Sequence, residues 1–243
     1  MNTLIAINHL EFAWPGQAPL LQIPHFELTK GESVFIKGPS GSGKSTLLGL
    51  LAGIQVANQG QLQFLGRDLS RLSARARDQV RADHLGYIFQ QFNLLPFLSV
   101  IENVCSALIF SRHKRARLTQ DATAEAARLL RELQLAPELW QQPVHKLSIG
   151  QQQRVAAARA LMGSPELVIA DEPTSALDAD SRSAFMTLLF QECRRQGSSL
   201  IFVSHDPALE PLFERVLSLS SINKSSLNKT ALNKSVINEA PSC

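Results

Sequence analysis

Three apolar runs along the chain have the length and composition of buried strands. They occupy residues 33–37, 167–172 and 199–203. Continuous apolar runs of about four to eight residues are typical of strands that are covered on both faces. The pattern therefore predicts an open α/β sheet.

Three further segments have the spacing and composition of helices. Residues 45–51 follow the first strand as an apolar helix, and residues 155–161 form an alanine-rich helix. Between residues 122 and 135 the apolar side chains recur near a helical period, which predicts an amphipathic helix. These side chains are Ala126, Leu129, Leu130 and Leu133.

The turn between the first strand and its helix carries the most specific chemistry. It has a glycine, four further residues and then Gly-Lys-Ser, a spacing that cradles nucleotide phosphates. Glycines let backbone N–H groups approach phosphate oxygens, Lys44 adds a positive charge, and the Ser45 hydroxyl is suited to Mg²⁺. The helix N-terminus points at the same place. The expected phosphate-binding residues are Gly38, Pro39, Ser40, Gly41, Ser42, Gly43, Lys44, Ser45 and Thr46.

Polar side chains also follow the other two strands. Asp171 and Glu172 end the second strand, and His205 lies just after the third. In open α/β sheets ligands bind beyond the carboxyl ends of the strands, so the carboxylates are expected near the phosphates. One carboxylate can hold Mg²⁺ through its water shell, while the other orients or deprotonates a water in line with the γ-phosphorus. The alternatives are a helix-capping acidic pair and a structural histidine.

Composition narrows the class of protein. The chain has 243 residues, 44% of them hydrophobic, which is enough for one fairly large domain. A net charge of +3 is too small to indicate nucleic-acid binding, and the basic run 112–117 is expected to be a solvated loop rather than a phosphate or lipid contact. Three widely spaced cysteines without zinc spacing indicate a reduced compartment. With no signal peptide and no long apolar stretch, the protein is expected to be soluble and cytoplasmic.

Taken in order, the motifs resemble those of the nucleotide-binding subunit of an ATP-binding cassette (ABC) transporter. The resemblance covers about residues 3–220. The matching motifs are the phosphate loop 38–45, the Q-loop glutamine Gln90, the signature 147–151, the Walker B strand 167–172, the D-loop 175–178 and the switch histidine His205. Trp14 resembles the aromatic residue that stacks on adenine, and Phe12 is a nearby rival.

This resemblance implies an α/β P-loop NTPase, with a RecA-like core, an N-terminal antiparallel β portion and an inserted α-helical signature subdomain. Residues 1–220 would form the ABC ATP-binding domain. The core would comprise about 1–90 and 163–220, and the helical subdomain about 91–162. Beyond residue 220 a five-residue repeat fits neither a helix nor a strand period, so 221–243 is expected to be a disordered tail.

The resemblance further implies that two copies of the chain bind ATP and Mg²⁺ at their mutual interface. The residues with catalytic roles would be Glu172, His205, Lys44 and Gln90. The residues that organise Mg²⁺ would be Ser45, Gln90 and Asp171. The signature residues that complete the nucleotide site from the other subunit would be Ser148, Gly150 and Gln151.

One residue departs from the usual signature, because Ile149 replaces its first glycine. If the backbone there is helical, the cost is small. If the position requires a left-handed glycine, closure of the dimer would be impaired. Because Glu172 and the rest of the signature are present, hydrolysis is expected to survive.

The family couples ATP hydrolysis to an integral membrane permease, which would hold the chain peripherally at the cytoplasmic face of the inner (plasma) membrane. The apolar stretch 92–98 is expected to be partly a groove for the permease and partly core. The segment 89–104 resembles ATPases of the lipoprotein-release and macrolide-export group, and an importer ATPase is the alternative. A DNA-repair cassette would need a longer insertion before the signature, and a translation factor would carry two cassettes.

Overall fold

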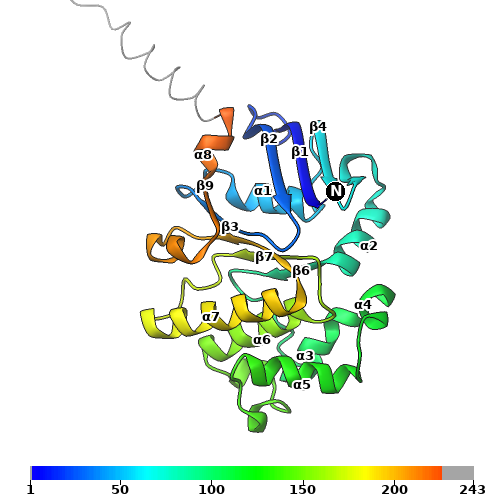
Figure 1. The fold of residues 1–243 in the computed structure, drawn as a ribbon, viewed down its shortest axis with the longest axis vertical. Helices are drawn as coiled ribbons and strands as arrows, with labels where there is room; N and C mark the ends of the chain where they lie inside the picture. The colour runs from blue at the N-terminus through cyan, green and yellow to red at the C-terminus, as the bar shows by residue number, and fades with distance from the viewer. Residues whose placement is uncertain (1, 226–243) are drawn as a thin grey trace, which may run out of the picture.

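Two β-sheets with different strand pairing organise the fold (Figure 1). The computed structural model describes residues 2–225. The antiparallel sheet has the order β2-β1-β4-β5, and the parallel sheet has the order β6-β7-β8-β3-β9. The strands are β1 Thr3–Phe12, β2 Leu21–Thr29, β3 Ser33–Lys37, β4 Gln59–Phe64, β5 Arg67–Asp68, β6 Leu85–Ile88, β7 Leu167–Asp171, β8 Ser199–Val203 and β9 Arg215–Ser218.

Helices occupy the intervals between the strands. They are α1 Lys44–Leu51, α2 Ala74–His84, α3 Val100–Cys105, α4 Arg112–Ala116, α5 Ala122–Glu132, α6 Ile149–Leu161, α7 Ala179–Gln196 and α8 Leu219–Ile222, joined in places by short 3₁₀ turns. The three expected strands are confirmed as β3, β7 and β8, and the three expected helices as α1, α5 and α6. Within residues 2–225 no helix combines the length and apolar character that crossing a bilayer requires.

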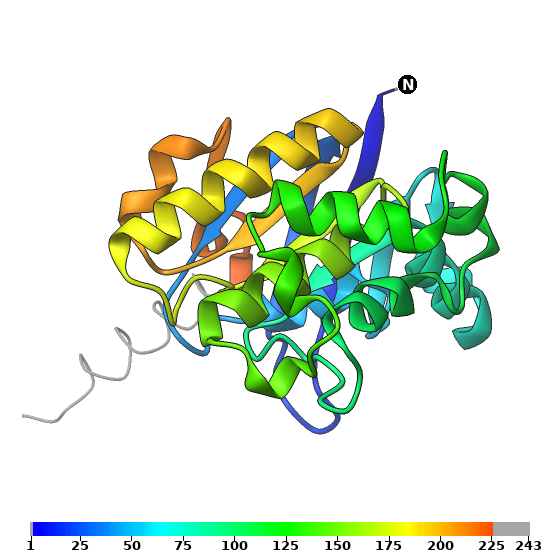
Figure 2. The ribbon, with the colours of Figure 1, turned by 90° about the horizontal axis from the view of Figure 1, so that it is seen from below.

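The parallel sheet separates two hydrophobic cores. Val34 and Ile36 of β3 pack with α1 and the antiparallel sheet, whereas Phe35 between them faces α3, α5, α6 and α7. Figure 2 views the molecule from the side of that helical layer, with the yellow α7 running across it. Because both faces are covered, β3 and β7 read as continuous apolar runs. Helices α3 to α6 lie in the interval 91–162, where a helical subdomain is expected; the subdomain boundaries themselves stay a prediction.

The basic run 112–117 is mostly exposed, as its composition indicates, but it is helical and its single lysine is buried. It forms helix α4, whose Lys114 is only 3% exposed and donates from Nζ to the Leu85 carbonyl at 2.7 Å. Burial lowers the pKa of Lys114 to about 8. Arg117 pairs with Glu166, just before β7. The charge pattern alone does not reveal these two contacts, because the backbone carbonyl and the carboxylate that bind the cations come from distant segments.

The last described residues fasten the chain to the turn between β1 and β2. Asn223 is buried; its Oδ1 accepts a hydrogen bond from the Gln22 N–H at 2.8 Å, and its Nδ2 donates to the Leu20 carbonyl at 2.9 Å. The Ser225 hydroxyl donates to the same carbonyl at 2.7 Å. The segment expected as a tail, 221–243, thus begins with residues that belong to the packed fold, and its remainder lies outside the described residues.

We expect Asn223→Ala to lower the free energy of unfolding by about 1–3 kcal/mol, because it removes the side-chain hydrogen bonds to the Gln22 N–H and to the Leu20 carbonyl at once. Urea denaturation followed by circular dichroism measures the change. Ser221→Ala is the matched control, since within residues 2–225 that exposed residue donates only to the nearby Ser218 carbonyl, and we expect a change within about 0.5 kcal/mol. Equal stability of the two variants would contradict the fastening role of Asn223.

Candidate functional site

Four neighbouring parallel strands end at one edge of the sheet, and each delivers a polar segment there. The phosphate loop follows β3, Gln90 follows β6, the acidic pair ends β7, and His205 follows β8. A cavity of about 430 Å³ opens at this edge. Its lining residues are Leu20, Ser40, Gly41, Gly43, Lys44, Ser45, Thr46, Gln90, Asp171 and Glu172. Loop, glutamine and carboxylates therefore meet as expected for ligands at the carboxyl ends of strands.

The backbone of the phosphate loop requires glycine at several positions. Gly41 and Gly43 have φ values of 74° and 100°, in the left-handed region that side chains disfavour. A Cβ at Gly38 would lie 2.8 Å from the Ser42 hydroxyl oxygen. That hydroxyl is buried and has no hydrogen-bond partner among the described residues. A buried donor without a partner next to a helix N-terminus fits a bound anion.

Lys44 holds its ammonium group over the loop. The side chain is 9% exposed, and Nζ donates to the carbonyl oxygens of Gly38 at 2.8 Å and Pro39 at 3.0 Å. Glu172 Oε1 lies 4.0 Å from the same nitrogen. The cation is therefore desolvated and already positioned at the cavity wall, where it would contact a phosphate.

Asp171 supplies a half-buried carboxylate beside the Ser45 hydroxyl. Burial raises the pKa of Asp171, and the adjacent Glu172 raises it further, while a hydrogen bond with Ser45 and the charge of Lys44 oppose the shift. Carboxylate, hydroxyl and the amide oxygen of Gln90 are the oxygen ligands that Mg²⁺ prefers. A divalent cation would relieve the desolvation cost of this carboxylate, so the donor set fits magnesium.

Glu172 is held in an unusual backbone conformation. It has a φ of 44°, rare for a residue other than glycine, and its N–H donates to the Val203 carbonyl at 2.9 Å. Such a conformation costs about 1–3 kcal/mol and is concentrated at functional sites. His205 Nδ1 lies 3.4 Å from Glu172 Oε2, although the histidine side chain itself is 69% exposed. His205 thus contacts Glu172, and Glu172 lines the cavity.

Of the two aromatic residues that compete for adenine, only one is accessible. Phe12 is 5% exposed and packs in the core beneath the antiparallel sheet. Trp14 is 38% exposed and meets the Phe12 ring edge-on at a centroid distance of 5.1 Å. Trp14 lies in the loop between β1 and β2, and Leu20 at the end of that loop lines the cavity. Accessibility therefore favours Trp14 as the stacking residue.

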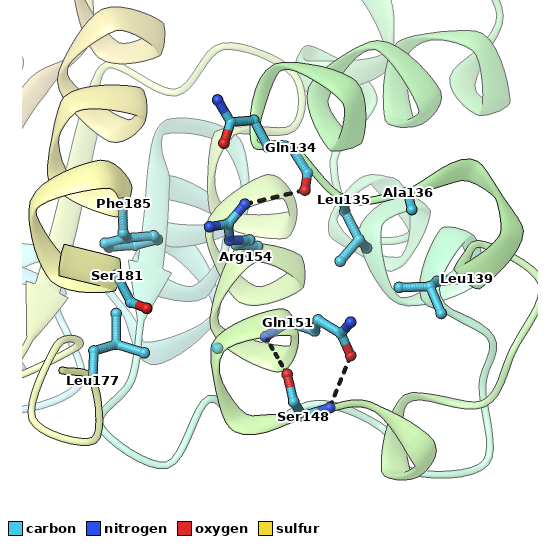
Figure 3. Close-up of a pocket in the computed structure, with 11 residues that line it drawn as sticks. Gln134, Leu135, Ala136, Leu139, Ser148, Gln151, Arg154, Leu177, Ser181 and Phe185 are labelled. Carbon is cyan, nitrogen blue, oxygen red and sulfur yellow. Dashed lines mark hydrogen bonds between the residues drawn. The ribbon is translucent and has the colours of Figure 1, made fainter.

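The signature residues line a cavity other than the one at the chain's own phosphate loop. Ser148 is the N-cap of α6 and forms a capping box with Gln151: Gln151 N–H donates to Ser148 Oγ at 3.3 Å, and Ser148 N–H donates to Gln151 Oε1 at 2.9 Å (Figure 3). These residues and Gly150 line a second cavity, of about 320 Å³, together with Leu177 of the expected D-loop. The two cavities have no lining residue in common. The signature is therefore available to another molecule.

Ile149 is compatible with this helix. It is the first residue of α6, and its φ is not positive. The site thus does not need a left-handed glycine here, and the extra side chain, 55% exposed, projects from the helix surface. The smaller of the two expected costs applies to the isolated chain.

Two contributors to the site carry no recognisable sequence signal. Leu20 lines the nucleotide-side cavity, yet it precedes the strand β2 without any motif. Arg182 on α7 forms an ion pair with Asp206, the residue after His205. Asp206 also caps the following turn by accepting from the Ala208 N–H at 2.9 Å. This pair anchors the loop that carries the histidine, and only the folded chain shows it.

Comparisons with known proteins agree with this geometry. Residues 21–175 match the sequence profile of the ABC transporter family. The lipoprotein-releasing system ATP-binding protein LolD 2 of Caulobacter vibrioides is 39% identical over 221 residues, 90% of this chain and 95% of that protein. The macrolide export ATP-binding/permease protein MacB of Shigella flexneri is 37% identical over 222 residues; these are 90% of this chain but 33% of MacB.

Solved structures show the same fold. A dimeric post-hydrolysis structure of the ATP-binding cassette MJ0796 bound to ADP and Pi has a TM-score of 0.78 and 31% identity, covering 88% of this chain and 94% of that one. The expected α/β P-loop NTPase fold is confirmed. The profile match, the relatives and the cavity built from phosphate loop and acidic pair lead to one conclusion: the chain belongs to the ABC transporter family and is an ATP-binding subunit with ATPase activity.

Proposed function

We propose that this ATPase works as a pair of copies that powers an exporter or a lipoprotein-release system. The carrying observation is the separation of the two cavities: one holds the phosphate loop and the acidic pair, and the other holds the signature. The nucleotide site at the first cavity is complete only when a second copy places its signature against the bound nucleotide. The dimeric cassette MJ0796 supports this arrangement.

Within the pair, each residue has a role that follows from its position. Lys44 and the loop amides hold the β- and γ-phosphates, and Trp14 stacks on the adenine. Ser45, Gln90 and Asp171 are the residues that would hold Mg²⁺. Magnesium, when bound, neutralises charge that develops on the transferred phosphoryl group.

Hydrolysis depends on the residues around the γ-phosphate. Glu172, the residue after Asp171, orients and deprotonates the attacking water. Its strained backbone holds the carboxylate toward the cavity. His205 steadies both Glu172 and the γ-phosphate. Ser148, Gly150 and Gln151 of the second copy present a hydroxyl and helix N–H groups to the other side of the phosphate.

The loop after Gln90 is the surface that we assign to the membrane permease. Phe92 is buried, whereas Phe97 is 75% exposed. Arg159 of α6 donates to the carbonyls of Phe92 and Asn93, both at 2.6 Å, so the loop is tied to the signature helix. A partner bound at Phe97 would therefore move with both the loop that follows Gln90 and the signature helix α6. Through this partner the chain would lie peripherally at the cytoplasmic face of the plasma membrane.

The relatives support export rather than import. LolD 2 is named for lipoprotein release and MacB for macrolide export. An importer ATPase is the second candidate, because the profile match shows the ABC transporter family and not the direction of transport.

Purification from native membranes separates the two candidates. The affinity-tagged chain is extracted with its permease in a mild detergent, and the permease is identified by mass spectrometry. We expect a permease that carries a large periplasmic domain, and we expect Phe97→Asp to reduce its recovery while Phe110→Asp, a change at a similarly exposed phenylalanine outside this loop, does not. Recovery of an importer permease with a separate substrate-binding protein would establish the alternative.

A further inference from the structure

Two histidines and a glutamate meet at a place that the nucleotide does not use. His84 ends helix α2, His113 lies in helix α4, and Glu166 directly precedes β7. The helices α2 and α4 lie side by side, at the right of Figure 1. His84 Nδ1 is 3.0 Å from Glu166 Oε2, and His113 Nε2 is 3.7 Å from Glu166 Oε1. One ligand atom from each of the three lies within 4.8 Å of the others.

These separations are close to those of a metal site. In a tetrahedral zinc site with bonds of about 2.0 Å, ligand atoms lie about 3.3 Å apart, and two imidazoles with one carboxylate form a common ligand set. The His84 and Glu166 side chains are mostly buried, at 15% and 23% exposure, whereas His113 is 41% exposed. Because the ligand atoms lie within 4.8 Å of one another, the side chain of His113, the most exposed member, would move inward on metal binding, and its exposed side leaves room for water.

The backbone around the cluster is firmly held. Ser111, the N-cap of α4, donates from its hydroxyl to Asp83, the neighbour of His84, at 2.6 Å. The Glu166 carbonyl accepts from the Ser199 N–H at 2.9 Å, which ties it to the sheet. Three segments that are far apart in the chain are thus fixed relative to one another before any ligand arrives.

The Glu166 carboxylate has one oxygen outside its ion pair with Arg117. Arg117 occupies Oε1, and Oε2 faces His84. The nearby positive charges of Arg117 and Lys114 are offset in part by Asp83.

We propose that His84, His113 and Glu166 form a binding site for a zinc-type divalent metal ion, with water completing the coordination. Zn²⁺ there would clamp helix α4 onto α2 and the parallel sheet, with Arg117 remaining on the outer carboxylate oxygen as a second-shell partner. The site is separate from the proposed nucleotide site and does not depend on it.

The test is zinc binding to the full chain, freed of metal with a chelator and kept without nucleotide. We expect isothermal titration to show one Zn²⁺ bound at this cluster, and Co²⁺ to give a visible absorption spectrum without thiolate bands. His113→Ala should weaken Zn²⁺ binding at least about tenfold and abolish the Zn²⁺-dependent rise in the thermal unfolding midpoint. Because His113 is the most exposed member, this variant is expected to fold.

Two control variants locate the metal. His25→Ala removes an exposed histidine on β2, and His205→Ala removes the one beside Glu172; both should bind Zn²⁺ at the cluster as the unmodified chain does. Zn²⁺ affinity unchanged by His113→Ala, or lost only with His205→Ala, would overturn the proposal. Absence of Zn²⁺ binding in the micromolar range would show that the cluster is an ion-pair network alone.

Discussion

Replacing Glu172 by glutamine is expected to preserve ATP binding and to slow hydrolysis by about 100- to 10,000-fold. Glutamine keeps the shape of the side chain and its reach toward Lys44 and His205, but it cannot accept the proton of the attacking water. Because ATP is then not consumed, the closed pair of copies should accumulate. Phosphate release measures turnover, and light scattering after gel filtration with ATP and magnesium measures the dimer.

The matched control for this variant is Glu214→Gln, which removes a carboxylate from an exposed position beyond β8. We expect its turnover to equal that of the unmodified chain. Brisk hydrolysis by Glu172→Gln would remove Glu172 from the role of base. A monomer at saturating ATP would contradict the shared site, even if turnover were lost.

Lys44→Ala is expected to weaken ATP binding by about 10- to 100-fold. The ammonium group of Lys44 is desolvated and positioned at the cavity, and hydrogen bonds to charged groups contribute about 1.5–3 kcal/mol. Binding of a fluorescent ATP analogue, titrated by anisotropy, measures the dissociation constant. Circular dichroism verifies that the variant is folded, since Lys44 also braces the loop carbonyls of Gly38 and Pro39.

Lys37→Ala separates this effect from a general loss of positive charge. Lys37 ends the same strand, immediately before the phosphate loop, but its ammonium group pairs with Glu210 at 2.8 Å instead of facing the cavity. We expect its affinity for ATP to change less than about threefold, as for a partly exposed ion pair. Equal losses in the two variants would mean that Lys44 acts only through net charge.

Much of the site was predictable because its chemistry is local. The phosphate loop needs glycines, a lysine and a serine at fixed spacing, and Gly41 and Gly43 do adopt the left-handed backbone that this requires. The strands β3, β7 and β8 were recognisable because burial on both faces leaves an uninterrupted apolar run. The acidic pair and His205 then follow from the rule that ligands gather at the carboxyl ends of strands.

Other features needed the packed chain. Phe12 and Trp14 are both large aromatic residues, and only their burial distinguishes them. The sequence alone left open whether the position of Ile149 requires a left-handed glycine, and the structure shows a helical backbone there. The run 112–117 is mostly exposed, as its composition indicates, but composition does not reveal that Lys114 reaches a buried carbonyl.

The amino-acid sequence by itself determined the family, the parallel strands and the phosphate-binding turn, since each depends on residues that are contiguous or regularly spaced. The tertiary structure decided which surfaces those elements present: a signature that lines a cavity separate from its own phosphate loop, and a histidine pair brought to Glu166 from segments before and after the Q-loop. The physical reason is that exposure and side-chain encounter depend on how distant segments pack, and that information is not contained in any local pattern.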